Sequence, residues 1–105
     1  MREWLVVLTA TEAVLADEPS PEAIRAVGEH YQRLVRLRDE GTVILAGRTM
    51  DAEPMGLVIY RARTAEEARA LSNADPAVAG GFMIAEVRPY AVAVWGEHAI
   101  TPPRG

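Results

Sequence analysis

The chain has no cysteine, no lysine and only two serines, and these absences exclude several classes of enzyme. Without cysteine there is no disulfide, no thiolate nucleophile, no iron–sulfur cluster and no cysteine-based zinc site. All 11 basic residues are arginine, which excludes Schiff-base chemistry and a P-loop lysine. Neither Ser20 nor Ser72 lies in the G-x-S-x-G setting of a serine hydrolase.

Long apolar runs and a basic surface are also missing. No run approaches the ~20 apolar residues that span a bilayer, and the Met1-Arg2-Glu3 start does not resemble a secretory signal. The net charge is −4, with arginines interleaved among carboxylates, whereas nucleic-acid binding favours a basic face. We therefore expect a soluble cytoplasmic protein with neither nucleic acid nor membrane as a partner.

The remaining composition is that of one globular domain. The chain has 105 residues, of which 50% are hydrophobic, with a mean hydropathy of +0.01. Two separately cored domains of half this length would each be marginal. We expect a single domain over residues 1–105, with its core in about 4–95 and a loose tail at 100–105.

Apolar runs and turn signals predict the order β-α-β-β-α-β, which is the ferredoxin-like α+β arrangement. The first helix begins at Ser20-Pro21 and runs to about Glu40, and the second begins at the capping box Thr64-Ala65-Glu66-Glu67 and runs to about Ser72. The strands are predicted at residues 4–8, 42–46, 56–60 and 82–87, with residues 90–95 as an extra C-terminal strand. Because Pro89 precedes this extra strand, we expect it at a sheet edge.

The first helix has an apolar stripe at a spacing of three and four residues. The stripe is predicted to contain Ile24, Val27, Tyr31, Leu34 and Val35. His30 borders this stripe, and Glu29 and Arg33 are placed as an ion pair on the outer face.

The strands are apolar on both faces instead of alternating. Leu5-Val6-Val7-Leu8 and Leu57-Val58-Ile59 leave apolar side chains on the sheet face that the two helices do not cover. A two-fold homodimer with its sheets packed face to face would cover them.

With thiols, lysine and serine triads removed, the candidates for chemistry are His30, His98, the carboxylates, the tyrosines and Arg48. Asp51 follows the second strand, which returns along the first helix after a tight turn. The lengths of helix and strand allow His30 and Asp51 to meet but do not require it.

The chain resembles the YciI-like (YCII-related) proteins over about residues 4 to 95. The resemblance is in the order and spacing of His30-Tyr31, Leu34, Leu37, Gly41, Leu45-Ala46-Gly47-Arg48, Asp51, Thr64-Ala65-Glu66-Glu67-Ala68, Leu71, Asp75-Pro76 and Arg88-Pro89-Tyr90. It implies a ferredoxin-like fold, a dimeric α+β barrel and a site centred on a His–Asp pair, here His30 and Asp51. Many members have proline where this chain has Arg48, and tryptophan where it has Tyr90. Most of the family has no assigned reaction, and some related members are cofactor-free lyases or isomerases of small cyclic acids, including dehydrochlorinases.

These residue types suit acid–base chemistry on a small molecule. Asp51 would fix the tautomer of His30, which would move the proton. Arg48 would hold a substrate carboxylate, and Tyr31 or Tyr90 would donate to a developing enolate. This chemistry needs no metal and no organic cofactor, and the His and Asp positions lack short-range metal-ligand spacing.

Each candidate residue also has an ordinary structural interpretation. His30 fits a structural histidine, Asp51 and Asp75 fit turns, Arg48 fits a surface charge, Tyr31 fits the core and His98 fits a solvated tail. The leading hypothesis is a cofactor-independent lyase or isomerase acting on a small cyclic or acidic metabolite. The alternatives are a non-catalytic dimeric ligand-binding module and an accessory protein.

Overall fold

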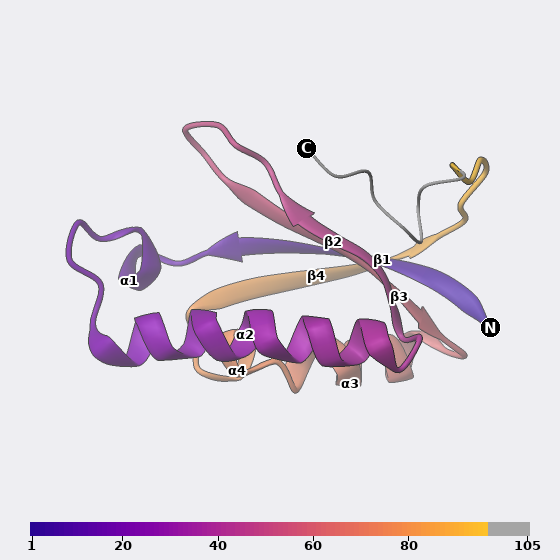
Figure 1. The fold of residues 1–105 in the computed structure, drawn as a ribbon, viewed down its shortest axis with the longest axis horizontal. Helices are drawn as coiled ribbons and strands as arrows, with labels where there is room; N and C mark the ends of the chain where they lie inside the picture. Colours follow the sequence, from indigo (N-terminus) through magenta and orange to yellow (C-terminus); the bar gives the residue numbers. More distant parts are fainter. Residues whose placement is uncertain (97–105) are drawn as a thin grey trace.

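The computed structural model describes residues 1–96, which form a four-stranded antiparallel sheet with helices on one face (Figure 1). The elements follow in the order β1 (Arg2–Ala10), α1 (Glu12–Leu15), α2 (Pro21–Asp39), β2 (Val43–Arg48), β3 (Met55–Ala62), α3 (Ala65–Asn73), α4 (Pro76–Ala79) and β4 (Met83–Tyr90). The sheet order is β2-β3-β1-β4. The predicted ferredoxin-like α+β fold is confirmed.

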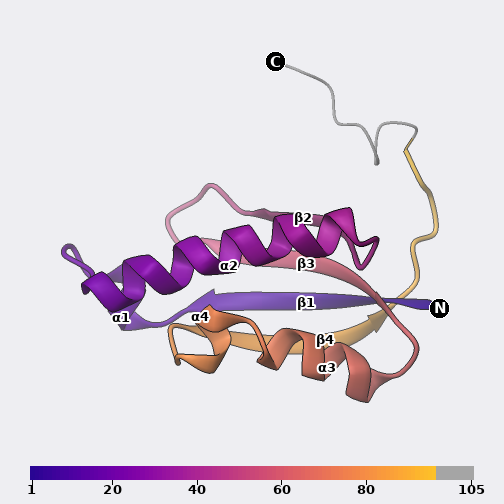
Figure 2. The same cartoon turned by 60° about the horizontal axis from the view of Figure 1, so that its bottom comes forward.

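Both long helices begin and end where the local chemistry predicts. The Ser20 hydroxyl accepts from the Ala23 amide at 3.1 Å at the start of α2, and Gly41 follows the helix with a φ of 84°. The Thr64 hydroxyl accepts from the Glu67 amide at 3.1 Å at the start of α3. Figure 2 shows α2 and α3 lying side by side along the same face of the sheet.

The structure differs from the predicted strands and turns at two places. β4 runs through Pro89 to Tyr90 on the sheet edge, as expected for a proline, but residues 91–96 form no strand. The Asp75-Pro76 dipeptide, predicted as a simple turn, begins the four-residue helix α4. The predicted tail at 100–105 lies outside the described residues.

The inward face of α2 is rotated from the prediction. Ala23, Ala26 and Leu37 are buried, whereas Ile24 and Tyr31 expose 62% and 67% of their surface. Small alanines allow the helix to approach the sheet closely, so the buried face carries less hydrophobicity than the pattern of large side chains suggested. The interpretation of Tyr31 as a core residue is wrong.

The rotation of α2 also turns two polar residues inward. His30 and Arg33 continue the 3–4 spacing of Ala23 and Ala26 toward Leu37, and both are partly buried. The predicted outer-face ion pair of Glu29 with Arg33 is therefore wrong, because the Arg33 side chain exposes only 11% of its surface.

The core lies between the helices and the inner face of the sheet. Its main cluster contains Val6, Leu8, Leu37, Val43, Val58 and Tyr60. Trp4, Ala62 and Ala68 form a second cluster, in which the Trp4 indole donates to the Ala62 carbonyl at 3.0 Å. Tyr60 brings a hydroxyl into the main cluster, next to the polar residues of α2. No helix among residues 1–96 is long and apolar enough to cross a membrane.

Candidate active site

The candidate site is centred on a short hydrogen bond between α2 and the start of α4. His30 Nδ1 lies 2.6 Å from Asp75 Oδ2, and the two side chains expose 12% and 3% of their surface. The bond joins residues 45 positions apart in the chain. It therefore depends on the docking of α4 against α2, and the two helices do pack together.

The position of Asp75 is fixed by the backbone around it. Asp75 is the N-cap of α4, Pro76 occupies the first helical position, and Asp75 Oδ1 accepts from the Ala77 amide at 2.9 Å. The Asp75 amide donates to the Ser72 carbonyl at the end of α3. One carboxylate oxygen therefore holds the helix start, and the other faces His30.

The surroundings of Asp75 keep this carboxylate ionised. Burial by itself would raise the pKa of Asp75, but the hydrogen bond and charge of His30, the Ala77 amide and the charge of Arg33 together lower the pKa below its ordinary value of 3.8. An ionised carboxylate only accepts hydrogen bonds. His30 Nδ1 is therefore the donor, and in a neutral ring Nε2 is the unprotonated nitrogen.

Arg33 of α2 lies between Asp75 and Tyr60 and adds two polar contacts to the His30–Asp75 pair. Arg33 Nη1 is 3.8 Å from Asp75 Oδ2, and the Arg33 guanidinium also lies beside the Tyr60 hydroxyl of β3. Burial raises the pKa of Tyr60, as does the charge of Asp75, while Arg33 acts in the opposite direction. The polar cluster thus consists of His30, Asp75, Arg33 and Tyr60.

Asp51, the predicted partner of His30, has a different hydrogen bond. It is exposed in the hairpin between β2 and β3, where Asp51 Oδ1 accepts from the Thr49 hydroxyl at 3.0 Å. That hydroxyl accepts in turn from the Met55 amide at 2.8 Å. The predicted contact of His30 with Asp51 is corrected to one with Asp75, because the β2–β3 hairpin uses Asp51 to close its own loop.

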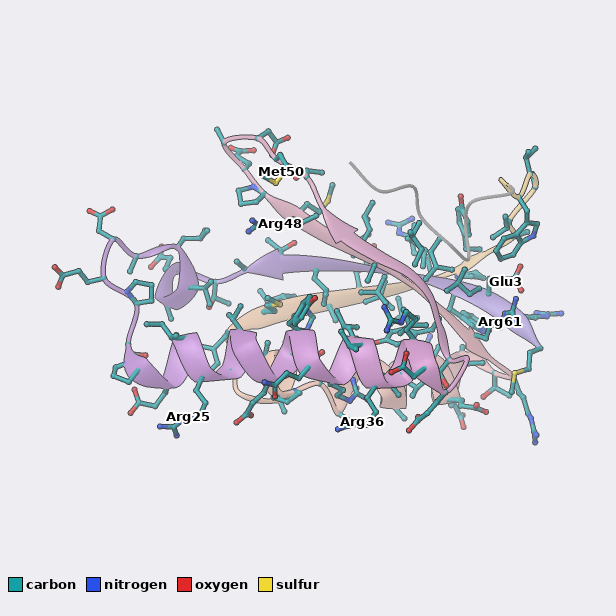
Figure 3. The ribbon with its side chains drawn as sticks, in the orientation of Figure 1. Glu3, Arg25, Arg36, Arg48, Met50 and Arg61 are labelled. Carbon is teal, nitrogen blue, oxygen red and sulfur yellow. The ribbon has the colours of Figure 1, made fainter. Side chains whose placement is uncertain are left out.

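The other predicted site residues within 1–96 form no hydrogen bond with the polar cluster. Arg48 ends β2 and is exposed at the same end of the hairpin as Met50, as Figure 3 shows. Tyr31 points to solvent, and Tyr90 is 44% exposed at the end of β4. Among the described residues, none of these three bonds to His30 or Asp75. His98 lies outside the described residues.

The sequence interpretation missed Asp75 and Arg33 as site residues. Asp75-Pro76 is part of the family resemblance, but its sequence fits a simple turn, and an N-cap aspartate looks the same in sequence as a turn aspartate. Arg33 follows His30 by three positions, the spacing of neighbours on one helix face. That spacing, together with a histidine on the inward face, was the available signal.

An apolar hollow lies one helical turn before His30. It is about 210 Å³ in volume and lies where α1 packs beside the start of α2. Its lining residues are Val14, Pro19, Ala23, Ile24 and Val27. Because Val27 precedes His30 by three positions, the hollow and the imidazole are neighbours along the helix. Within residues 1–96, no group of three His, Asp or Glu side chains could hold a metal ion.

Comparisons with known proteins agree with this fold. The sequence model of the YCII-related domain matches residues 3–91. A solved structure with a similar fold is 5-chloro-2-hydroxyhydroquinone dehydrochlorinase from Burkholderia phenoliruptrix, in complex with 2,5-dihydroxybenzoquinone. The match has a TM-score of 0.59 and 14% sequence identity, and it covers 91% of this chain and 97% of the dehydrochlorinase. A search of curated proteins finds no match.

Proposed function

This chain belongs to the YCII-related family, and from that premise we propose that it is a cofactor-independent enzyme that moves protons on a small cyclic or acidic metabolite. His30 is the group that takes and returns the proton, and Asp75 orients it. The observation that carries the proposal is the 2.6 Å bond between His30 Nδ1 and Asp75 Oδ2, which leaves Nε2 for the substrate.

An elimination needs few groups, and the cluster supplies them. Loss of HCl from a chlorinated ring removes one proton and one chloride, so the step needs a base but no electron acceptor. His30 Nε2 would accept the proton, and the imidazolium formed would be stabilised by the ionised Asp75. The fold shared with a dehydrochlorinase supports this reaction class.

The apolar hollow supports a ring-shaped substrate. Its volume of about 210 Å³ exceeds the roughly 150 Å³ of a cavity that binds benzene. A six-membered ring seated there would lie beside His30. Val27→Trp, which fills the hollow, should weaken ring binding at least tenfold and leave the circular dichroism spectrum unchanged.

Turnover of four proteins tests the catalytic proposal. Chloride release from chlorinated hydroxyhydroquinones, and isomerisation of small unsaturated cyclic acids, would be measured for the wild type, His30→Ala, Asp75→Asn and Asp51→Asn. Loss of the base should lower kcat/KM by about 10²–10⁴-fold. Asp75→Asn should also cause a large loss, and the control Asp51→Asn should stay within about threefold.

Two outcomes would contradict the proposal. If Asp51→Asn lowers kcat/KM as far as Asp75→Asn does, the hairpin carboxylate belongs to the site and the assignment to Asp75 is wrong. If the wild type binds these compounds in a thermal-shift titration but turns none of them over, the protein is a ligand-binding module.

We also propose that two copies pair through the outer face of the sheet. The strand registers place Leu5 opposite Ile59, and Val7 opposite Leu57, on the face away from the helices. Leu45 of β2 pairs with Ile59 and is 58% exposed. A row of apolar side chains across three strands is typical of a buried interface.

The oligomeric state tests this pairing directly. Size-exclusion chromatography with light scattering should give twice the chain mass for the wild type, and the chain mass for Leu57→Arg. Ile24→Arg is the matched control, because Ile24 is also apolar and exposed but lies on α2. A wild-type protein that is monomeric at tens of micromolar would overturn the pairing.

A further inference from the structure

Arg33 is a buried cation of which one donor nitrogen, Nη1, has no acceptor among the described residues, although its guanidinium lies within hydrogen-bonding reach of the Tyr60 hydroxyl. Its side chain exposes 11% of its surface, and Nη1 is fully buried with no hydrogen-bond partner among residues 1–96. Its nearest opposite charge is Asp75 Oδ2, at 3.8 Å. That distance is an ion pair but is longer than a hydrogen bond.

This arrangement costs stability. A buried charged donor without an acceptor forfeits its hydration, and a whole buried ion pair replaced by apolar side chains of similar volume is often equally or more stable. Arg33 therefore needs an explanation other than packing. Its position offers one, because Arg33 lies three positions after His30 and shares the carboxylate of Asp75 with it.

The charges of the cluster depend on Arg33. The ionisable groups in contact here are His30 and Arg33 from α2, Asp75 at the start of α4, and Tyr60 from β3. With Arg33 present, the positive guanidinium balances the carboxylate, and a neutral His30 leaves the cluster uncharged. Without Arg33, the carboxylate would be balanced only if His30 held a second proton.

We propose that Arg33 is a positioning residue that neutralises Asp75, so that His30 bonds to the carboxylate as a neutral imidazole with Nε2 unprotonated. The inference rests on the proposed function, because only an unprotonated Nε2 can act as the base. A neighbouring carboxylate favours the protonated form of an imidazole, and an imidazole with a protonated Nε2 cannot act as a base. Arg33 opposes that second proton by charge repulsion, acting through the shared oxygen.

The protonation state of His30 can be observed without any substrate. ¹⁵N NMR of the ring nitrogens would be recorded at pH 7 in a His98→Gln background, which leaves His30 as the single histidine. We expect the neutral ring with its proton on Nδ1. In Arg33→Met the ratio of imidazolium to neutral ring should rise at least about tenfold, because a unit charge a few ångströms away is removed.

Control variants separate this role from a structural one. Arg36→Met removes an exposed arginine of the same helix and should leave the ¹⁵N spectrum unchanged. Arg33→Lys restores the charge and should return the neutral ring. Arg33→Met combined with Asp75→Asn removes both charges and should also return the neutral ring. If Arg33→Met alone does not fold, Arg33→Gln, which keeps a polar side chain without the charge, takes its place and should show the same rise of the imidazolium.

Two results would overturn the inference. One is a wild-type His30 that is already an imidazolium at pH 7. The other is a neutral Nδ1–H ring in Arg33→Met, equal to that of the wild type. Neither result depends on turnover, so a failure here is distinct from a failure of the proposed enzymatic function.

Discussion

Replacing Asp75 is the most informative perturbation of the fold, because one side chain serves a helix cap, a histidine and a buried arginine. Asp75→Ala removes the cap on Ala77, which is worth about 1 kcal/mol. It also leaves Arg33 buried without its counter-charge, and breaking a buried pair in this way costs about 3–5 kcal/mol. The two losses share one side chain and are not additive, so we expect Asp75→Ala to lower the free energy of unfolding by about 3–5 kcal/mol.

Asp75→Asn separates the charge from the cap. The asparagine carbonyl can still accept from the Ala77 amide, so only the charged contacts are lost, and hydrogen bonds to charged groups are worth about 1.5–3 kcal/mol. Asp51→Ala is the matched control, because Asp51 is exposed and its side chain bonds to Thr49 within the hairpin. Its effect should stay below about 1 kcal/mol.

Urea denaturation at a fixed protein concentration measures these differences. A second series against pH tests the electrostatic part. Folding lowers the pKa of Asp75, so the carboxylate's contribution is fully present above its unfolded value of 3.8 and is lost as the pH falls through the lower folded value. The gap between wild type and Asp75→Asn should therefore shrink as the pH falls below about 4. Equal stabilities of Asp75→Ala and Asp51→Ala would refute the reasoning.

Three further predictions concern the surroundings of the site. Burial raises the pKa of Tyr60 above its unfolded value of 10.0. The stability that Tyr60 contributes is therefore present below pH 10 and is lost as the pH rises through the higher folded pKa. Tyr60→Phe should flatten the loss of stability that circular dichroism shows above about pH 10. Trp4→Phe loses the indole bond to the Ala62 carbonyl and should lower the free energy of unfolding in urea by about 1–2 kcal/mol, whereas no change would mean that the bond is not formed. Thr64→Ala removes the cap on Glu67 and should lower the melting temperature by about 4–8 °C per kcal/mol lost, while Thr64→Ser should restore it.

The fold could be predicted from the sequence because its signals are local. Ser20-Pro21, Gly41 and Thr64 each mark a helix end through their own local chemistry, and the structure has the helix ends within two residues of those signals. Pro89 predicts an edge position for an extra strand at 90–95, but it lies inside β4, which is itself an edge strand and tolerates a residue without an amide proton. The extra strand predicted at residues 90–95 is absent, because Tyr90 ends β4 and residues 91–96 form no strand. Tyr90 pairs with Glu3 and β1 begins at Arg2, so the chain beyond Tyr90 runs past the end of its neighbouring strand.

The partner of His30 could not be predicted, because it depends on how α2 is rotated and where α4 docks. Large apolar residues such as Ile24 and Tyr31 suggested one inward face, and the alanines define another. The rotation of α2 decides which side chains beside His30 face the sheet. Two carboxylates follow predicted helix or strand ends, Asp51 and Asp75, and both fit turns. Only the long-range contact distinguishes them.

The four side chains of the polar cluster come from separate parts of the sequence, but the fold brings them into contact, so that their charges influence one another. His30 and Arg33 come from one turn of α2, whereas Asp75 is held by its own cap and Tyr60 by the centre of the sheet. The four side chains are therefore fixed by three elements, α2, the start of α4 and β3, and a change in any one of the side chains alters the charges that the other three experience. A charge-conserving substitution such as Arg33→Lys should be tolerated better than a size-conserving one such as Arg33→Met. The opposite order of stabilities would mean that shape, and not charge balance, has kept an arginine beside the carboxylate.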